Sequence, residues 1–168
     1  STVNVSNLSG LPRATTEMTI GANLPSTLPV KTPPESVEST ATIFDSLGTS
    51  HELTFVFKKK GPTEWNVLAK SPTLKIDSNG LNKEVLVKNF EFDGTGAPKE
   101  NLSALDLTIT GFKGDNGAAT GQKIDIDMGN KGDLDGLTNF ASEFTGFTEL
   151  NQNGLRFGNF TGVNVDDE

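Results

Sequence analysis

Cysteine is absent from this chain of 168 residues, and histidine occurs only once, at position 51. Without cysteine, the chain has no disulfide framework, no thiolate nucleophile and no cysteine-ligated zinc site. A Ser-His-Asp triad or a histidine metal site would have to include His51. Asp45 and Ser46 lie near it in sequence, but residues 45–48 are typical of a turn and lack the Gly-x-Ser-x-Gly motif. We therefore predict that the chain is not an enzyme and has no catalytic residue, cofactor or bound metal.

Clusters of basic residues and long apolar segments are also missing. The formal net charge is −8, and the only basic run is Lys58-Lys59-Lys60, at the end of an expected strand. Proteins bind nucleic acids and anionic membranes through clustered lysine and arginine, so we expect neither as a partner. No apolar segment approaches the roughly 20 residues that a membrane-spanning helix requires. The N-terminus lacks a secretion-signal pattern, and we expect the sequence to be a fragment of a longer protein.

Helical periodicity is nearly absent, whereas short apolar or alternating segments recur between Gly, Asn, Asp and Pro residues. In residues 52–57, Leu53, Phe55 and Phe57 form one face of the alternation, which is the pattern of a half-buried strand. Apolar residues make up 33% of the chain, and 11 Phe and one Trp supply bulk for a core. We predict an all-β fold, an antiparallel flattened barrel or sandwich with short hairpins and at most one short helix. The expected strands are 16–22, 37–44, 52–59, 65–70, 74–77, 84–92, 104–110, 123–128 and 162–165.

The turns between these strands carry residues that tolerate positive φ, as two-residue hairpins require. The pairs concerned are Asn79-Gly80, Asp93-Gly94, Asn116-Gly117, Asp135-Gly136 and Asn153-Gly154, and we expect several to form hairpins. The possible helix covers residues 137–144, where Thr138 would cap it and Phe140 and Phe144 have i,i+4 spacing.

Four prolines between residues 23 and 35 interrupt strand pairing, because proline has no backbone N–H to donate. We expect this segment to be a linker. Residues 1–28 would then form an arm or linker that leads toward another domain, and residues 29–168 would form the compact β-domain.

Two patterns suggest a bound ligand, but each has a simpler interpretation. Asp125, Asp127, Asp133 and Asp135 offer oxygen atoms of the kind that calcium prefers, but the spacing departs from an EF-hand loop. The alternation of aspartate and isoleucine favours a solvated strand face, and the sequence leaves weak calcium binding open. Trp65 could stack on a sugar, but its place at the start of a strand favours a core position.

Residues 42–57, followed by Trp65-Asn66-Val67, resemble the flagellar hook protein family. The outer domain of that family has a strand, an Asp-Ser-x-Gly-x-x-His turn, an apolar strand and a downstream tryptophan. Between residues 82 and 123 we find no pattern of the family. Further similar segments are 11–16, 22–25, 74–81, 124–126, 137–141 and 150–163. The family turn and core residues, expected to be structural, are Asp45, Ser46, Gly48, His51, Phe55, Phe57 and Trp65.

The resemblance implies a mechanical function. Hook proteins polymerise into a hollow, curved tube that joins the rod to the filament and transmits torque, and domains of this kind lie outside an inner domain. The implied location is extracellular, in the bacterial flagellum, and the implied partners are other copies in a helical assembly. Rod proteins share some of these segments, but the length of the insertion favours a hook protein. We expect the isolated domain to be a monomer.

The main alternative is an extracellular β-sandwich adhesin or carbohydrate-binding module. Such a domain would recognise a glycan through Trp65 and exposed phenylalanine side chains.

Overall fold

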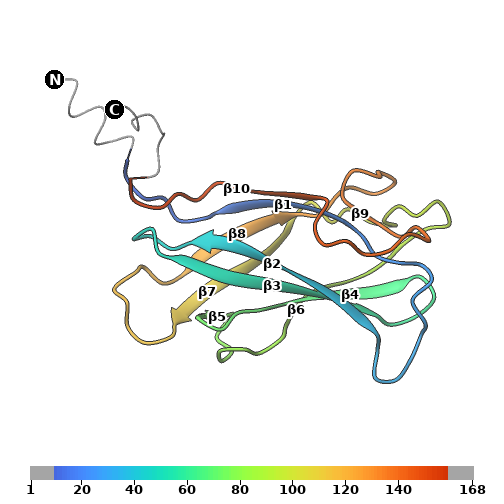
Figure 1. The fold of residues 1–168 in the computed structure, drawn as a ribbon, viewed down its shortest axis with the longest axis horizontal. Helices are drawn as coiled ribbons and strands as arrows, with labels where there is room; N and C mark the ends of the chain where they lie inside the picture. The colour runs from blue at the N-terminus through green and yellow to red at the C-terminus, as the bar shows by residue number, and fades with distance from the viewer. Residues whose placement is uncertain (1–9, 159–168) are drawn as a thin grey trace.

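The computed structural model describes residues 10–158, which form ten β-strands in two sheets (Figure 1). Within this range the regular elements are all strands, so the all-β prediction is confirmed. The expected strand at 162–165 lies outside the described residues. No helix in the described part of the chain has the length and apolar character needed to cross a membrane. The strands are β1 (Glu17–Asn23), β2 (Ser36–Phe44), β3 (Ser50–Lys59), β4 (Glu64–Lys70), β5 (Leu74–Ile76), β6 (Val85–Glu91), β7 (Leu105–Phe112), β8 (Gln122–Asp127), β9 (Leu137–Thr138) and β10 (Glu149–Gln152).

The four-stranded sheet has the order β2-β3-β4-β6 and is antiparallel throughout. Its longest pairing joins β2 to β3 from Ser36 opposite Lys58 to Phe44 opposite Ser50. The turn at residues 45–49 closes this hairpin. A register shift at Val67/Leu68 separates the two halves of the β4–β6 pairing. Strands β6 and β7 both lie within residues 82–123, where we found no pattern of the family in the sequence.

The six-stranded sheet has the order β10-β1-β8-β7-β5, with β9 also paired to β1. The pairings of β1 with β8 and with β9 are parallel, whereas we expected antiparallel pairing throughout. Parallel neighbours need a long crossover between them. Here the chain between β1 and β8 builds the whole of the second sheet, so β1 and β8 are distant in sequence and adjacent in space.

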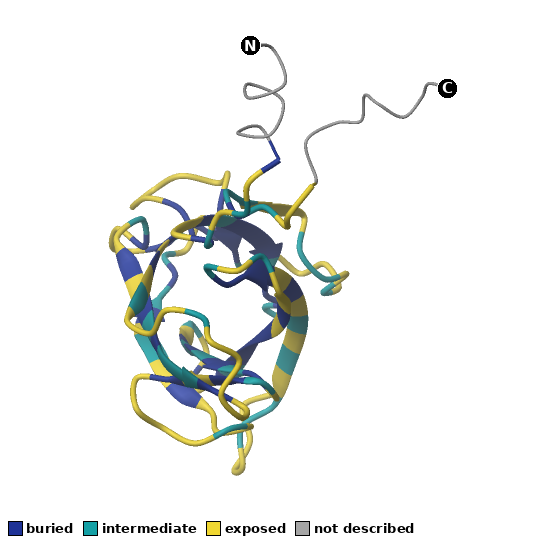
Figure 2. Cartoon of the chain, turned by 90° about the vertical axis from the view of Figure 1, so that its left-hand side faces the viewer, coloured by how far each residue is buried: buried dark blue, intermediate teal, exposed yellow. Residues whose placement is uncertain are grey.

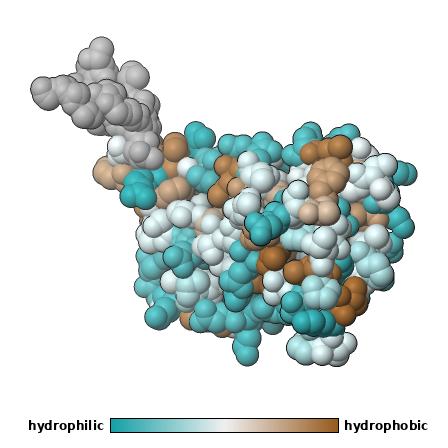
Figure 3. Space-filling view, turned by 45° about the vertical axis from the view of Figure 1, so that its right-hand side comes forward, coloured by the Kyte–Doolittle hydropathy of each residue, from teal (hydrophilic) through white to brown (hydrophobic). Residues whose placement is uncertain are grey.

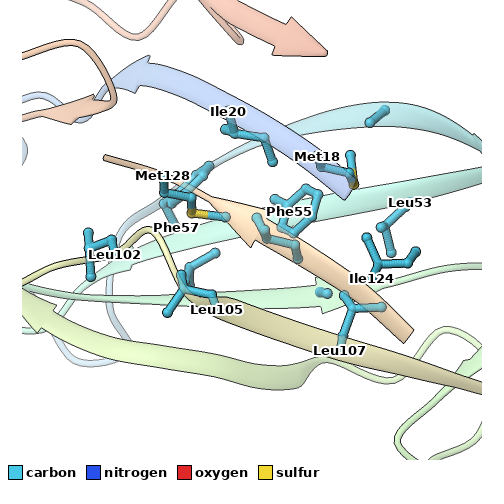
Figure 4. Packing of buried hydrophobic residues seen from close by; sticks show 14 of the residues in the cluster. Met18, Ile20, Leu53, Phe55, Phe57, Leu102, Leu105, Leu107, Ile124 and Met128 are labelled. Atoms are coloured by element: carbon cyan, nitrogen blue, oxygen red, sulfur yellow. The ribbon is translucent and has the colours of Figure 1, made fainter. Parts of the chain in front are cut away.

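Alternating side chains of both sheets fill the space between them. Phe55 and Phe57 of β3 face Met18 and Ile20 of β1, and the four side chains are at most 2% exposed (Figure 4). Viewed from one end, the two curled sheets surround this buried interior (Figure 2). Burial of large apolar side chains at roughly 25 cal/mol per Å² stabilises such a two-layer arrangement. The sandwich or flattened-barrel prediction is thus confirmed.

The expected helix at residues 137–144 is wrong. Leu137 and Thr138 form β9 beside β1, and Phe140 is 41% exposed. The N–H of Phe140 donates to Asn23 Oδ1, and its carbonyl accepts from the backbone of Ser26. These bonds to a distant segment satisfy backbone groups that a helix would have paired locally. Local spacing was therefore overridden by tertiary contacts.

The expected two-residue hairpins are also wrong. Hairpin neighbours are joined instead by residues 45–49, 60–63 and 113–121. Asn116-Gly117 lies within the last of these connections. Asp93-Gly94 begins the turn between Phe92 and Pro98, which form an isolated antiparallel bridge. The remaining pairs occur where the chain passes between sheets or into a loop. Of the five glycines only Gly117 has a positive φ, so these pairs predict turns but not two-residue hairpins.

The proline-containing segment is an ordered connection rather than a linker to another domain. Lys59, only 3% exposed, donates from Nζ to the carbonyls of Ser26 at 2.8 Å and Leu28 at 2.7 Å. Burial lowers the pKa of Lys59. Before this segment, β1 pairs with three strands, so the folded unit begins well before the expected boundary at residue 28.

Candidate functional site at the base of the domain

The two ends of the described chain lie side by side. Arg13 and Leu155 exchange backbone hydrogen bonds of 2.9 and 2.8 Å, and the N–H of Gly158 donates to the carbonyl of Gly10 at 2.7 Å. The incoming and outgoing segments thus leave from one end of the molecule (Figure 1). We call this end the base and define it as residues 10–15, 44–51 and 152–158.

Asp45 organises the turn between β2 and β3. It is 1% exposed, and its Oδ1 accepts from the backbone N–H groups of Leu47 at 3.0 Å and Thr49 at 3.1 Å. Its Oδ2 accepts from His51 Nε2 at 2.8 Å and from Asn116 Nδ2 at 3.1 Å. A buried carboxylate costs several kcal/mol unless its lone pairs are satisfied, and here four donors converge on it.

His51 is held between Asp45 and the next connection of the chain. Because a carboxylate only accepts hydrogen bonds, Nε2 carries the proton and donates a hydrogen bond to Asp45. Nδ1 lies 2.8 Å from the hydroxyl of Thr73, and the ring centroid lies 5.4 Å from that of Phe112. Both ring nitrogens are therefore occupied by structural partners.

Ser46 is turned to a different partner. Its Oγ accepts from the backbone N–H of Ala119 at 2.8 Å, and this bond ties the turn to the β7–β8 connection. The structure places Asp45, Ser46 and His51 in one turn but does not give His51 a free nitrogen to activate the serine.

Gly48 brings the turn against both ends of the chain. Its φ is +83°, and a Cβ there would lie 2.8 Å from the backbone nitrogen of Phe157 and 2.8 Å from Cβ of Pro12. A side chain would thus meet both backbone strain and a clash. The Asp-Ser-x-Gly spacing fits a turn that nests between the incoming and outgoing segments.

Further polar groups join the two sheets at the base. Gln122 Nε2 donates to the carbonyls of Thr15 at 2.7 Å and Phe44 at 3.0 Å. The hydroxyl of Thr15 donates to Gln152 at 2.6 Å and accepts from the N–H of Phe44 at 3.0 Å. The guanidinium of Arg156 lies 5.7 Å from the ring centroid of Phe44. Sequence reasoning missed these residues because their partners are distant along the chain.

The other predicted residues lie away from the turn. Phe55 and Phe57 belong to the core. Trp65 of β4 pairs with Lys59, which lies at the far end of β3 from His51. Trp65 is 1% exposed, and its Nε1 has no hydrogen-bond partner among the described residues. The indole ring is thus packed inside the domain and offers no exposed face to a sugar.

The acidic segment stays solvated. Asp125 lies between Glu17 of β1 and Asp106 of β7 on neighbouring strands, and Lys123 Nζ is 3.5 Å from the Asp125 carboxylate. Asp127 accepts from the N–H of Gly129. Residues 10–158 contain no group of three or more His, Cys, Asp or Glu side chains arranged to hold a metal ion.

A hollow of about 520 Å³ lies at the edge of the four-stranded sheet. Its wall includes Lys60, Lys99, Glu64 and Glu91, and Lys99 is paired with Glu91 at 3.0 Å. Asn89, Glu100 and the aromatic residues Trp65 and Phe90 complete the lining, and Trp65 and Phe90 are at most 4% exposed. The hollow lies away from the His51 turn.

We predict that Gly48→Ala lowers the free energy of unfolding by about 2 kcal/mol, through backbone strain together with the clash described above. Gly114→Ala is the matched control, because Gly114 has a φ of +69° but a Cβ there would meet nothing within 4 Å. Urea denaturation should show a smaller loss, about 1 kcal/mol, for the control. Equal losses for the two variants would contradict the close approach at Gly48.

We predict that His51→Ala leaves the fold intact and costs at most about 2 kcal/mol, the loss of local hydrogen bonds and ring packing. Thermal unfolding followed by circular dichroism measures the loss, and a spectrum of unchanged shape reports the intact fold. A variant that does not fold at all would contradict a purely local role.

The fold and the base together define a class of structural β-domain. In this class hydrogen-bonded polar groups hold the turns in place, and the two chain ends lie together at one end of the domain. Residues 21–155 match the model of the flagellar basal body protein FlaE D2 domain, and the chain belongs to this family.

The curated relatives are two versions of the flagellar hook protein FlgE of Helicobacter pylori, from strains ATCC 700392 / 26695 and J99. Each is 27% identical to this chain over 129 residues, which cover 75% of this chain and 17% of the relative. The chain therefore corresponds to less than a fifth of these proteins. A solved 32 kDa fragment of the flagellar hook protein FlgE from Caulobacter crescentus is 20% identical, with a TM-score of 0.54 over 70% of this chain and 46% of that fragment. This likeness supports the fold.

Proposed function

We propose that this chain is the outer structural domain of a flagellar hook subunit and that it packs against copies of itself in a curved extracellular tube. The domain family and the named relatives support a structural role in the hook. The observation that carries the proposal is the base, where the incoming and outgoing segments are hydrogen-bonded to each other. A domain with paired ends can be inserted into a longer subunit without disturbing the subunit's own fold.

In this proposal the domain acts through its exterior. The two nitrogens of the sole histidine are engaged in hydrogen bonds, and the ring of the sole tryptophan is buried. Contacts between unlike faces of identical subunits do not close on themselves and so generate helical tubes. Relative movement of such domains would let the tube bend while it transmits torque.

Excision of the domain tests the proposal in the parent bacterium. Because Gly10 O and Gly158 N are 2.7 Å apart, residues 11–157 can be replaced by a short glycine linker without spreading the flanking segments. We expect the shortened subunit to be exported, but hooks built from it to have altered curvature and to support little swimming. A control subunit carries an unrelated β-domain with adjacent ends, and it should fail in the same way because it lacks the specific contacts.

Normal hook curvature and normal swimming after the excision would refute the proposed function. Electron microscopy of isolated hooks and tracking of swimming cells provide the two measurements.

A further inference from the structure

Three large apolar side chains are exposed on the adjacent segments of the base. Leu11 is 51% exposed, Leu47 is 54% exposed and Phe157 is 72% exposed. The turn at Gly48 packs against Pro12 and the backbone of Phe157, so the chain segments that carry the three residues lie next to one another. The Leu47 side chain lies near Gly117 of the β7–β8 connection. Figure 3 shows apolar surface beside the point where the chain leaves the described domain. Exposed apolar groups are ordinary when single, but a group of them marks an interaction surface.

Both arginines of the chain lie at this same surface. Arg13 and Arg156 are exposed, and neither forms an ion pair with another described residue. The remainder of this acidic chain uses lysine as its cation. Arginine and phenylalanine are enriched in protein interfaces, whereas lysine is depleted there. The base thus has the composition of an interface.

The position of the base identifies what covers it. Both ends of the described chain leave here, so a folded continuation of the polypeptide is held beside Leu47 and Phe157 at an effective concentration that a free partner would not reach. The Helicobacter relatives extend far beyond the segment that this chain matches. Within residues 10–158 the two guanidinium groups have no ion-pair partner, and beside apolar side chains they favour a partner surface with an apolar patch flanked by carboxylates.

We propose that Leu11, Arg13, Leu47, Arg156 and Phe157 form a docking surface for the adjoining domain of the same subunit, which meets it with an apolar, acidic patch. This inference rests on the proposed function, in which the chain is one domain of a longer subunit. The hydrogen bonds of Asp45 hold Leu47 in place for this contact. The contact fixes the orientation of this domain relative to the adjoining domain, so the connection between the two domains is rigid rather than a free hinge.

Single-cysteine labelling tests the contact, because the chain contains no cysteine of its own. Leu47→Cys is introduced into the 168-residue chain and into a full-length subunit otherwise free of cysteine, and the rate of alkylation by a maleimide is measured. The matched control is Leu86→Cys on β6, which is similarly exposed at 49% and lies away from the base. We expect Leu47→Cys to react at least about tenfold more slowly in the full-length subunit than in the isolated chain, as for a contact formed most of the time. Leu86→Cys should react at equal rates in both.

Two results would overturn the inference. Equal rates for Leu47→Cys in the two proteins would mean that the adjoining domain leaves the base uncovered. Slowing of the reaction in the isolated chain as its concentration rises would mean that a second copy occupies the surface instead. Hook assembly by the same full-length variants is scored separately, so a failed contact with normal hooks leaves the proposed function standing.

Discussion

Replacing Asp45 by alanine is expected to destabilise the domain by about 3 kcal/mol, because removal of one partner from a buried hydrogen-bonded pair leaves the others unsatisfied. The four donors that converge on this carboxylate include two backbone N–H groups of the turn. Without these hydrogen bonds the turn loses its shape, and Gly48 no longer packs between the two chain ends. Urea denaturation of the isolated chain measures the effect.

Asp115→Ala provides the control for this prediction. Asp115 also accepts a hydrogen bond from a backbone N–H two residues on, but it is exposed, and its loss should cost less than about 0.5 kcal/mol. The double variant Asp45→Ala with His51→Ala should lose at least about 1 kcal/mol less than the sum of the two single losses, since Asp45 and His51 share one hydrogen bond. Additive losses would contradict the coupled network.

Trp65→Ala is expected to cost about 4 kcal/mol, since deletion of a fully buried aromatic side chain removes its contacts and leaves a cavity. Trp65→Phe should recover most of this loss, because it keeps an aromatic core residue and removes an indole N–H that lacks a partner. Leu86→Ala, at a half-exposed position, is the control and should cost less than about 1 kcal/mol.

The same variants separate a core residue from a sugar-stacking one. A carbohydrate-binding module would keep its stability in Trp65→Ala and lose glycan binding. Wild-type stability in that variant, together with loss of binding on a glycan array, would contradict the core assignment and favour the adhesin alternative.

The sequence predicted those parts of the fold that depend on neighbouring residues. The alternation of Leu53, Phe55 and Phe57 identified β3 and one buried face, and the Asp45–His51 spacing identified a turn. The strand is not half-buried as expected, because Thr54 and Val56 on its other face are also buried. The parallel position of β1 could not be predicted, because it depends on β8, about a hundred residues away. The false helix at 137–144 has the same cause, since Asn23 and Ser26 bind its backbone from the other end of the sequence.

The base was predictable only in part. The family turn pointed to Asp45, Ser46, Gly48 and His51, but nothing local indicated that Gln122 joins the two sheets or that Gly10 meets Gly158. The exposed leucine at position 47 sits inside the motif and carries no signal of its own in the sequence. Its importance follows only from the nearness of both chain ends.

Helical reconstruction of hooks by electron cryomicroscopy is the most direct measurement of the central proposal that this domain works by touching identical neighbours. We expect the domain to stand on the outer surface of the tube, joined to its subunit through the base, with side-chain contacts to the same domain in adjacent subunits. A reconstruction in which the domain touches no neighbouring copy, or holds a small molecule in a cleft beside His51, would contradict the proposal.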